Sequence, residues 1–142
     1  MKRLNLRTIP RPSTKDGKPI FPTLPNDLTT LDDHQLGRLY TQFAAMASYV
    51  QLELAVVAVE RAAVKHVERR LRAERRVVSD GTNIPDRDAE VENDSRVREW
   101  ALEGTKAEAL EMMLTSTLQS YLIGRDATSR EQTRRQNETR RS

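Results

Sequence analysis

The chain has 142 residues, a length typical of a single domain. It contains no cysteine, which excludes a disulfide framework and a cysteine-ligated zinc site. Charged residues make up 32% of the sequence and aromatic residues 4%, so thin helices with wide solvated faces are expected rather than a thick globular core. No apolar run approaches the roughly 20 residues that span a bilayer, and no apolar segment follows the basic N-terminus as in a secretory signal. A membrane partner is therefore not expected.

Residues 1–29 are predicted to form an extended, basic, proline-rich arm. Five prolines exclude a regular helix and the interior of a sheet: Pro10, Pro12, Pro19, Pro22 and Pro25. A purely solvated linker would not need the apolar side chains of Ile20, Phe21 and Leu24. We therefore expect these residues to dock, either on a neighbouring subunit or back on the arm's own helix.

A first long helix is predicted over residues 31–78, with Thr30 as its N-cap. An apolar residue occurs at every seventh position through six heptads: Leu36, Phe43, Val50, Val57, Val64 and Leu71. This spacing is typical of a helix that packs along one stripe, as in a coiled coil.

Residues 79–94 are predicted to be a polar loop, because Asp80-Gly81 and Ile84-Pro85 are typical of turns. We expect its acidic residues to neutralise the arginines at the end of the first helix. A second helix is predicted over residues 95–124, capped by Asn93, Asp94 or Ser95. The basic tail, residues 125–142, either extends this helix or is disordered.

Together these elements predict an all-α fold in which two long antiparallel helices form a coiled-coil-like hairpin, residues 30–124. If Val77 lay opposite Ser95, Ile123 would lie opposite Tyr49. The first part of the first helix would then face only the polar tail. A second subunit or the arm would have to cover its apolar residues, which are Leu36, Leu39, Tyr40, Phe43 and Met46. A homo-oligomer is therefore expected.

The sequence gives no support for an enzyme. His34 and His66 lie far apart on one predicted helix, and the serines have no histidine and aspartate in a pattern that would activate them. The acidic loop lacks the glycine and final glutamate of a calcium-binding loop. We expect no catalytic residue, no cofactor and no metal.

The basic arm and tail are predicted to project from the same end of the hairpin. Arginine suits bidentate contacts with phosphate, so these segments predict binding to a nucleic-acid backbone, including single-stranded DNA. The predicted contacts are Arg130, Arg134, Arg135, Arg140 and Arg141 of the tail and Lys2, Arg3, Arg7 and Arg11 of the arm. The alternative is that Glu131 and Glu138 pair with the tail arginines, or that the tail docks on an acidic protein.

The order of parts resembles that of small helical accessory proteins of tailed phages. The segment LTTLDDHQLGRLY opens the first helix, and LQSYLIGRDATSREQTRR closes the second. The pattern is similar to UvsY-type recombination mediators, and less closely to small terminase subunits. The first resemblance implies a ring-forming helical hairpin that helps load a recombinase on single-stranded DNA in the host cytoplasm. The second implies DNA packaging, although the proline-rich arm leaves no room for the usual separate DNA-binding domain. A virion structural protein, with another phage protein as its partner, is a third reading.

Overall fold

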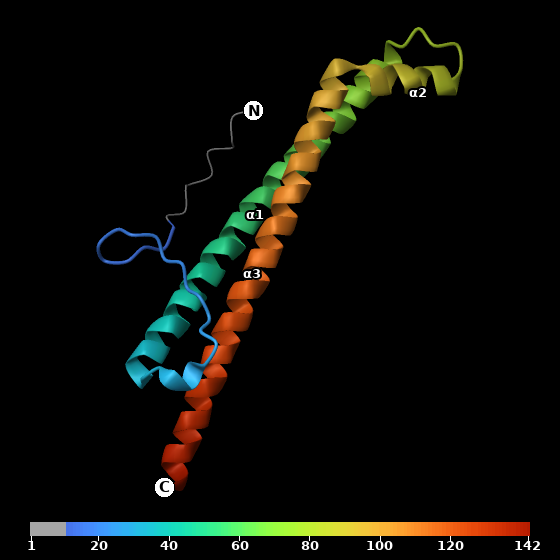
Figure 1. The fold of residues 1–142 in the computed structure, drawn as a ribbon. Coiled ribbons are helices and arrows are strands. Elements are labelled where there is room, and N and C mark those ends of the chain that lie inside the picture. The colour runs from blue at the N-terminus through green and yellow to red at the C-terminus, as the bar shows by residue number, and fades with distance from the viewer. Residues whose placement is uncertain (1–10) are drawn as a thin grey trace. The chain divides into compact units, whose positions relative to one another are not determined.

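The computed structural model describes residues 11–142 (Figure 1). Four helical elements follow one another: the 3₁₀ turn η1 (Leu28–Thr30), α1 (Asp33–Val77), α2 (Ile84–Asn93) and α3 (Ser95–Arg141). The described part of the chain has no β-strand, only a single bridge between Ser13 and Pro19. The predicted all-α fold class is therefore confirmed.

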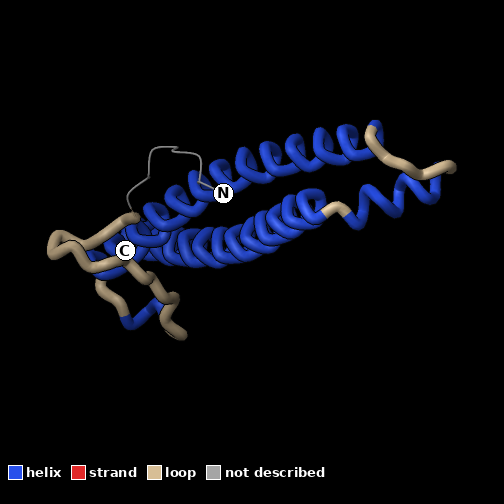
Figure 2. The backbone as a smooth tube through the Cα atoms, turned by 90° about the horizontal axis from the view of Figure 1, so that it is seen from above, coloured by secondary structure: helices blue, strands red, loops and turns tan. Residues whose placement is uncertain are grey.

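Contacts divide the chain into two compact units. We call residues 55–113 the loop unit, and residues 11–54 with 114–142 the terminal unit. In each unit, one half of α1 lies beside one half of α3, and the two run in opposite directions (Figures 1 and 2). Each unit thus shows the predicted antiparallel pairing of two long helices.

The core of the terminal unit lies between the first half of α1 and the second half of α3. Leu36, Phe43, Met46 and Val50 are buried there. Residues 125–141 are helical, so α3 runs on past the predicted end of the second helix. This corrects the expectation that the start of α1 lies uncovered. Leu36, Phe43 and Met46 are already buried within one chain, whereas Leu39 is half-buried and Tyr40 is exposed.

The register of the pairing also differs from the predicted one. A Cβ built on Gly37 would lie 3.9 Å from the side chain of Gln132, and one built on Gly124 would meet the ring of Phe43. The expected register placed Ile123 opposite Tyr49, so the observed pairing is shifted by about one helical turn.

Helix α1 begins at Asp33, and its cap is Asp32 rather than the predicted Thr30. The Asp32 carboxylate accepts a hydrogen bond from the amide of Gln35 at 2.7 Å. In return, the side-chain oxygen of Gln35 accepts one from the amide of Asp32 at 3.0 Å. Each side chain satisfies an amide that the first turn leaves without a helical partner. Asp27 caps η1 in a similar way, through Thr29.

In the loop unit, helix α2 occupies most of the segment predicted to be a loop. The side chain of Asn83 caps it, accepting a hydrogen bond from the amide of Asp86 at 2.9 Å. Pro85 lies in the first turn, where its missing N–H costs no helical hydrogen bond. Val91 is buried with the apolar stripe of α1, which continues here as Val57, Val64 and Leu71. The Ile84-Pro85 pair thus starts a helix, and the turn prediction was wrong.

The acidic residues of this segment neutralise the arginines of α1, as predicted. Arg76 pairs with Asp88 at 2.7 Å, and Arg72 pairs with Glu92. Arg75 lies 3.6 Å from Glu90 and 3.5 Å from Asp94. Asp94 also caps α3, since its carboxylate accepts hydrogen bonds from the amides of Arg96 and Val97. Asp94 was one of the three predicted caps.

The expectation that no apolar run is long enough to span a bilayer needs correction. Helix α1 contains an 18-residue stretch with at most two charged residues that is long and apolar enough to cross a membrane. Only 28% of that stretch is buried in the chain. Core helices of soluble proteins pass the same test, so the stretch by itself assigns no membrane role.

The close approach of α3 to Phe43 predicts opposite effects for two glycine-to-alanine substitutions. Gly124→Ala would push a methyl group into the Phe43 ring and should lower the free energy of unfolding by about 1–3 kcal/mol. Gly37→Ala meets only an ordinary contact with Gln132 and should raise it by up to about 1 kcal/mol, because alanine favours the helix. Urea unfolding followed by circular dichroism measures both. Equal stabilisation by the two substitutions would contradict the observed register.

Candidate nucleic-acid interface

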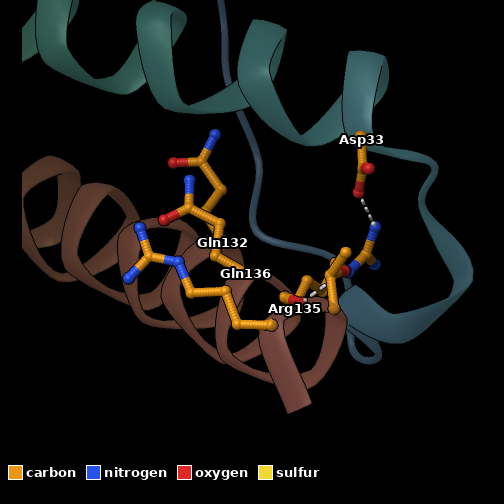
Figure 3. A pocket seen from close by; sticks show the side chains of 6 residues that line it. Asp33, Gln132, Arg135 and Gln136 are labelled. Carbon is orange, nitrogen blue, oxygen red and sulfur yellow. Dashed lines mark hydrogen bonds and ion pairs between the residues drawn. The ribbon is translucent and has the colours of Figure 1, made fainter. Parts of the chain in front are cut away.

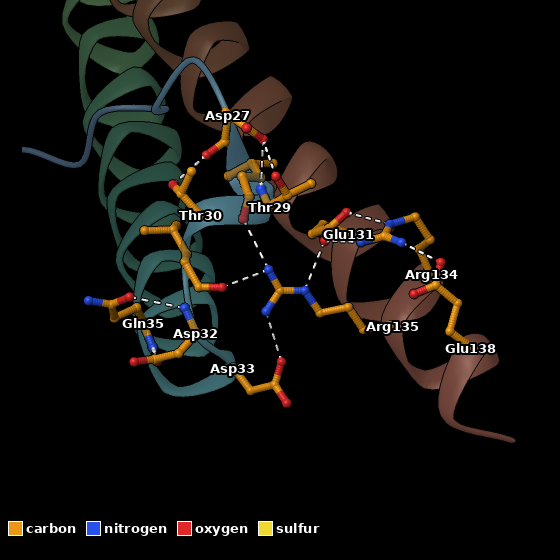
Figure 4. Close-up of polar contacts among 12 residues, drawn as sticks. Asp27, Thr29, Thr30, Asp32, Asp33, Gln35, Glu131, Arg134, Arg135 and Glu138 are labelled. Carbon is orange, nitrogen blue, oxygen red and sulfur yellow. Dashed lines mark hydrogen bonds and ion pairs between the residues drawn. The ribbon is translucent and has the colours of Figure 1, made fainter. Parts of the chain in front are cut away.

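Arg135 joins three segments of the terminal unit through one guanidinium group (Figure 4). It donates hydrogen bonds to the backbone carbonyls of Leu28, at 3.1 Å, and Leu31, at 2.7 Å. It also pairs with Asp33 at 2.9 Å and with Glu131 at 2.8 Å. We call this set of contacts the Arg135 clasp. The Arg135 side chain is only 20% exposed, so its guanidinium group binds within the terminal unit and is not available to a partner.

Glu131 completes the clasp from within α3. Its carboxylate also accepts two hydrogen bonds from Arg134, at 2.7 and 2.9 Å. Hydrogen bonds from Arg134 and Arg135 lower the pKa of Glu131 to about 2. The same contacts raise the pKa of both arginines. Glu131 therefore stays charged and holds the two guanidinium groups in place.

Arg134 carries a second acidic partner, Glu138, one turn further along α3. Glu131 and Glu138 thus pair with tail arginines along the helix, as the alternative reading of the sequence proposed. Arg134 nevertheless remains exposed at the surface. Its ion pair with Glu138 is exposed on both sides, and such pairs contribute little stability and can be replaced by a phosphate.

Three other tail arginines have no acidic partner among the described residues: Arg130, Arg140 and Arg141. All three are exposed. Arg130, Arg134 and Arg141 follow a spacing of four and then seven residues, which places them on one face of α3. We call this row the arginine face. Arg125 pairs with its neighbour Asp126 at 3.4 Å and does not belong to it.

A cavity of about 390 Å³ lies between the start of α1 and the end of α3 (Figure 3). The residues that line it all carry a polar or charged group: Asp33, Gln132, Arg135, Gln136, Thr139 and Arg140. Asp33 and Arg135 are paired with each other across it, so Arg140 supplies its unpaired positive charge. The cavity therefore adds amide and hydroxyl hydrogen-bonding groups beside the clasp.

The arm folds back on its own helices, one of the two outcomes predicted for it. Pro22 is buried, and with Leu24 it lines a cavity whose other walls include Phe43, Tyr121 and Gly124. Phe21 does not line this cavity and is 65% exposed, while Leu24 is 42% exposed and Ile20 is half-buried. The residue that anchors the arm is thus a proline that the sequence interpretation treated only as a helix breaker.

The basic residues of the arm fall into two groups. Lys2, Arg3 and Arg7 lie outside the described residues. The guanidinium carbon of Arg11 lies 4.4 Å from the centre of the Phe21 ring, a cation–π contact within the arm. A tight loop brings Arg11 and Phe21 together, with Gly17 at a φ of 76° and the Ser13–Pro19 bridge closing it. Among the described residues, Arg11 makes no contact with the arginine face.

Among residues 11–142, no group of three or more histidine, cysteine, aspartate or glutamate side chains is placed to hold a metal ion. Comparison with protein-family models, with characterised proteins and with solved structures gives no match. The interpretation of the site therefore rests on the geometry of the chain itself.

The clasp was not predicted from the sequence, although part of its signal was visible there. Glu131 and Arg135 are four residues apart, and that spacing predicts an ion pair on a helix. The contacts of Arg135 with Leu28 and Leu31 span more than 100 positions and involve backbone carbonyls. No sequence pattern marks a backbone acceptor, so Arg135 was grouped with the phosphate contacts.

The clasp predicts acid sensitivity. The pKa of Glu131 is about 2 in the folded chain against an ordinary 4.5, so its stabilising contribution is complete above pH 4.5. That contribution is lost as the pH falls toward 2. The free energy of unfolding of Glu131→Gln should be lower than that of the native chain at neutral pH. The difference between the two should disappear in acid. Urea unfolding at a series of pH values measures it.

Asp126→Asn is a suitable control, because the Asp126 carboxylate lies on the same helix and contacts the adjacent Arg125. The difference in free energy of unfolding between Asp126→Asn and the native chain should change much less between neutral and acid pH. A difference for Glu131→Gln that stays constant between neutral and acid pH would contradict the strong pairing of Glu131.

Proposed function

We propose that this protein is a non-enzymatic, oligomeric accessory protein of nucleic-acid metabolism that binds the phosphate backbone without sequence preference. The arginine face of α3 is the proposed contact surface. This proposal follows the resemblance to UvsY-type recombination mediators, which implies single-stranded DNA as the ligand and the host cytoplasm as the location.

The supporting observation is the alignment of Arg130, Arg134 and Arg141 along one exposed face. They are spaced about 6 and 10 Å apart along the helix axis, at 1.5 Å per residue. Guanidinium groups in a row can each contact a phosphate, and phosphate contacts give affinity without reading the base sequence. The regular helix fixes this spacing in a way that a disordered tail could not.

The charge of the segment supports the same proposal. Residues 125–142 contain six arginines against three carboxylates, an excess of three positive charges. The whole chain has a formal net charge of +3, so the remainder is neutral overall. That neutral remainder includes the basic arm, since residues 1–18 contain six lysines and arginines against one aspartate. The positive charge available to attract a polyanion is therefore concentrated in the arm and in the last turns of α3.

A double substitution on the arginine face tests the proposal. Arg130→Ala with Arg141→Ala should weaken the binding of labelled oligothymidylate, measured by fluorescence anisotropy at low salt. The slope of log affinity against log salt concentration should fall by about 1.4, since each lost contact with single-stranded DNA removes about 0.7. Deleting residues 125–142 is a poorer test, because it would also remove the clasp and uncover the start of α1.

The matched control is Arg69→Ala with Arg70→Ala, which removes the same charge from exposed positions of the loop unit. It should leave the salt slope nearly unchanged. If the native chain does not bind the oligonucleotide at low salt, the proposed function is wrong. If the two double variants lose equal affinity, only the arginine face is wrong as the contact surface.

A second candidate function is structural assembly, as in a virion or packaging component. Its support is the exposure of Phe21 and Leu24 beside an arm anchored by Pro22. Large apolar side chains held at the surface by an ordered segment suit insertion into a neighbouring subunit or another protein. The resemblance to small terminase subunits and virion proteins belongs to this reading.

This second candidate predicts that Phe21→Ala with Leu24→Ala lowers the mass of the assembled species, as measured by light scattering. The helical content should stay unchanged, because Pro22 remains in place. Val78→Ala with Ile84→Ala is the control, since both residues are exposed apolar residues of the loop unit. An unchanged mass for the arm variant would contradict an assembly role for the arm.

A further inference from the structure

A second group of arginines lies at the end of α1, in the loop unit. Residues 69–76 contain five arginines and one glutamate, which gives this stretch a formal charge of +4 over about two turns of helix. Its basic side chains are all arginines, whose planar guanidinium groups suit bidentate contacts with carboxylates and phosphates. Two of them, Arg72 and Arg76, are four residues apart and therefore lie on one face of α1. We call these two the covered pair.

Helix α2 opposes this charge with carboxylates. Residues 84–94 contain five carboxylates and one arginine, a formal charge of −4, so the charges of the two segments cancel. Glu92 pairs with Arg72, and Asp88 pairs with Arg76 at 2.7 Å. The two carboxylates, like the two arginines, are one helical turn apart, about 6 Å along the axis. Helix α2 thus presents negative charges to the covered pair at a regular spacing, as the phosphates of an extended nucleic-acid strand do.

The attachment of α2 depends largely on these ion pairs. Val91 is the single buried residue of α2, while Ile84 is 75% exposed. The side chains of Asp88 and Arg76 are 49% and 64% exposed, and that of Glu92 is 65% exposed. Ion pairs between exposed side chains are individually weak and are screened by salt. Removing the charge of the two carboxylates should therefore free the covered pair.

Most of the core of the loop unit lies outside α2. The buried residues that α1 and α3 contribute there are Val57, Val64, Leu71 and Val97. Non-helical backbone borders α2 on both sides, at residues 78–83 and at Asp94. We therefore expect α1 and α3 to stay paired when α2 shifts.

We infer that the covered pair is a second phosphate-binding surface, which α2 keeps closed in the native chain. The carboxylates of Asp88 and Glu92 act as an internal competitor for the two guanidinium groups, so a nucleic-acid backbone finds these groups occupied. The inference rests on the phosphate-backbone ligand of the proposed function, but not on the arginine face of α3. A polyanion gains a charge-assisted contact at each guanidinium group that is freed.

The partners that remain after α2 shifts set the size of the expected effect. Arg75 is not part of the surface, because it lies 3.5 Å from Asp94, whose carboxylate caps α3. Arg72 keeps one carboxylate of its own helix, Glu68, at 3.0 Å. Arg76 has no acidic partner besides Asp88 among the described residues. One full phosphate contact is therefore expected from Arg76, and up to one more from Arg72.

Neutralising the two carboxylates tests the inference. The binding of labelled oligothymidylate to the full chain with Asp88→Asn and Glu92→Gln is measured by fluorescence anisotropy over a series of salt concentrations. Affinity at low salt should rise above that of the native chain. The slope of log affinity against log salt concentration should become steeper by about 0.7–1.4, since each contact with single-stranded DNA adds about 0.7. Circular dichroism checks that α1 and α3 remain helical.

Asp80→Asn with Glu99→Gln is the matched control, because it removes the same charge from exposed positions of the loop unit. Among the described residues, neither of these carboxylates pairs with an arginine. The control should leave the salt slope nearly unchanged. Equal steepening in the two double variants would indicate a general effect of net charge and overturn the inference.

A further variant identifies the arginines that make the new contacts. Adding Arg72→Ala and Arg76→Ala to the neutralised chain should return the salt slope to its native value. A slope that stays steep would place the new contacts elsewhere and contradict the inference.

Failure of the inference and failure of the proposed function give different results. If the native chain binds and the neutralised chain binds no more tightly than the control, only the inference is wrong. If the native chain does not bind at low salt but the neutralised chain does, the proposed function is wrong and the inference stands. If neither binds, both are wrong.

Discussion

The burial of every seventh residue of α1 is the constraint on which the two units depend. Leu36, Phe43 and Val50 supply it in the terminal unit, and Val57, Val64 and Leu71 supply it in the loop unit. A helix running alongside covers such a stripe over its whole length, and in each unit that helix is a part of α3.

The arginines at the end of α3 fall into a half-buried set and an exposed set. Arg135 faces inward and is held by four acceptors, while Arg130 and Arg141 face outward without an acidic partner among the described residues. Arg134 lies between these roles, exposed but bound to two carboxylates. Charge count alone treats the four as equivalent. Only the direction in which each side chain leaves the helix distinguishes a structural arginine from one available to a ligand.

Much of the fold could be predicted from periodicity, and the misses share a physical cause. The heptads predict α1 and the antiparallel pairing because local hydrophobic spacing decides them. The start of α1 lies two residues after the predicted one, because Asp32 and Gln35 form a reciprocal cap that takes the role predicted for Thr30. Helix α2 was missed because Pro85 is compatible with both a turn and the first turn of a helix. The site was predicted less well, since Arg135 binds backbone atoms of residues distant in sequence.

The clasp acts on Leu28 and Leu31 through their carbonyl oxygens, which every amino acid carries. The hydrogen bonds of the clasp therefore do not depend on which side chains these two positions carry. Other contacts of the arm do depend on side chains, because Pro22 is buried and the Asp27 carboxylate caps η1. Leu28 and Leu31 are thus positions at which the sequence can vary while Arg135 keeps its two backbone acceptors.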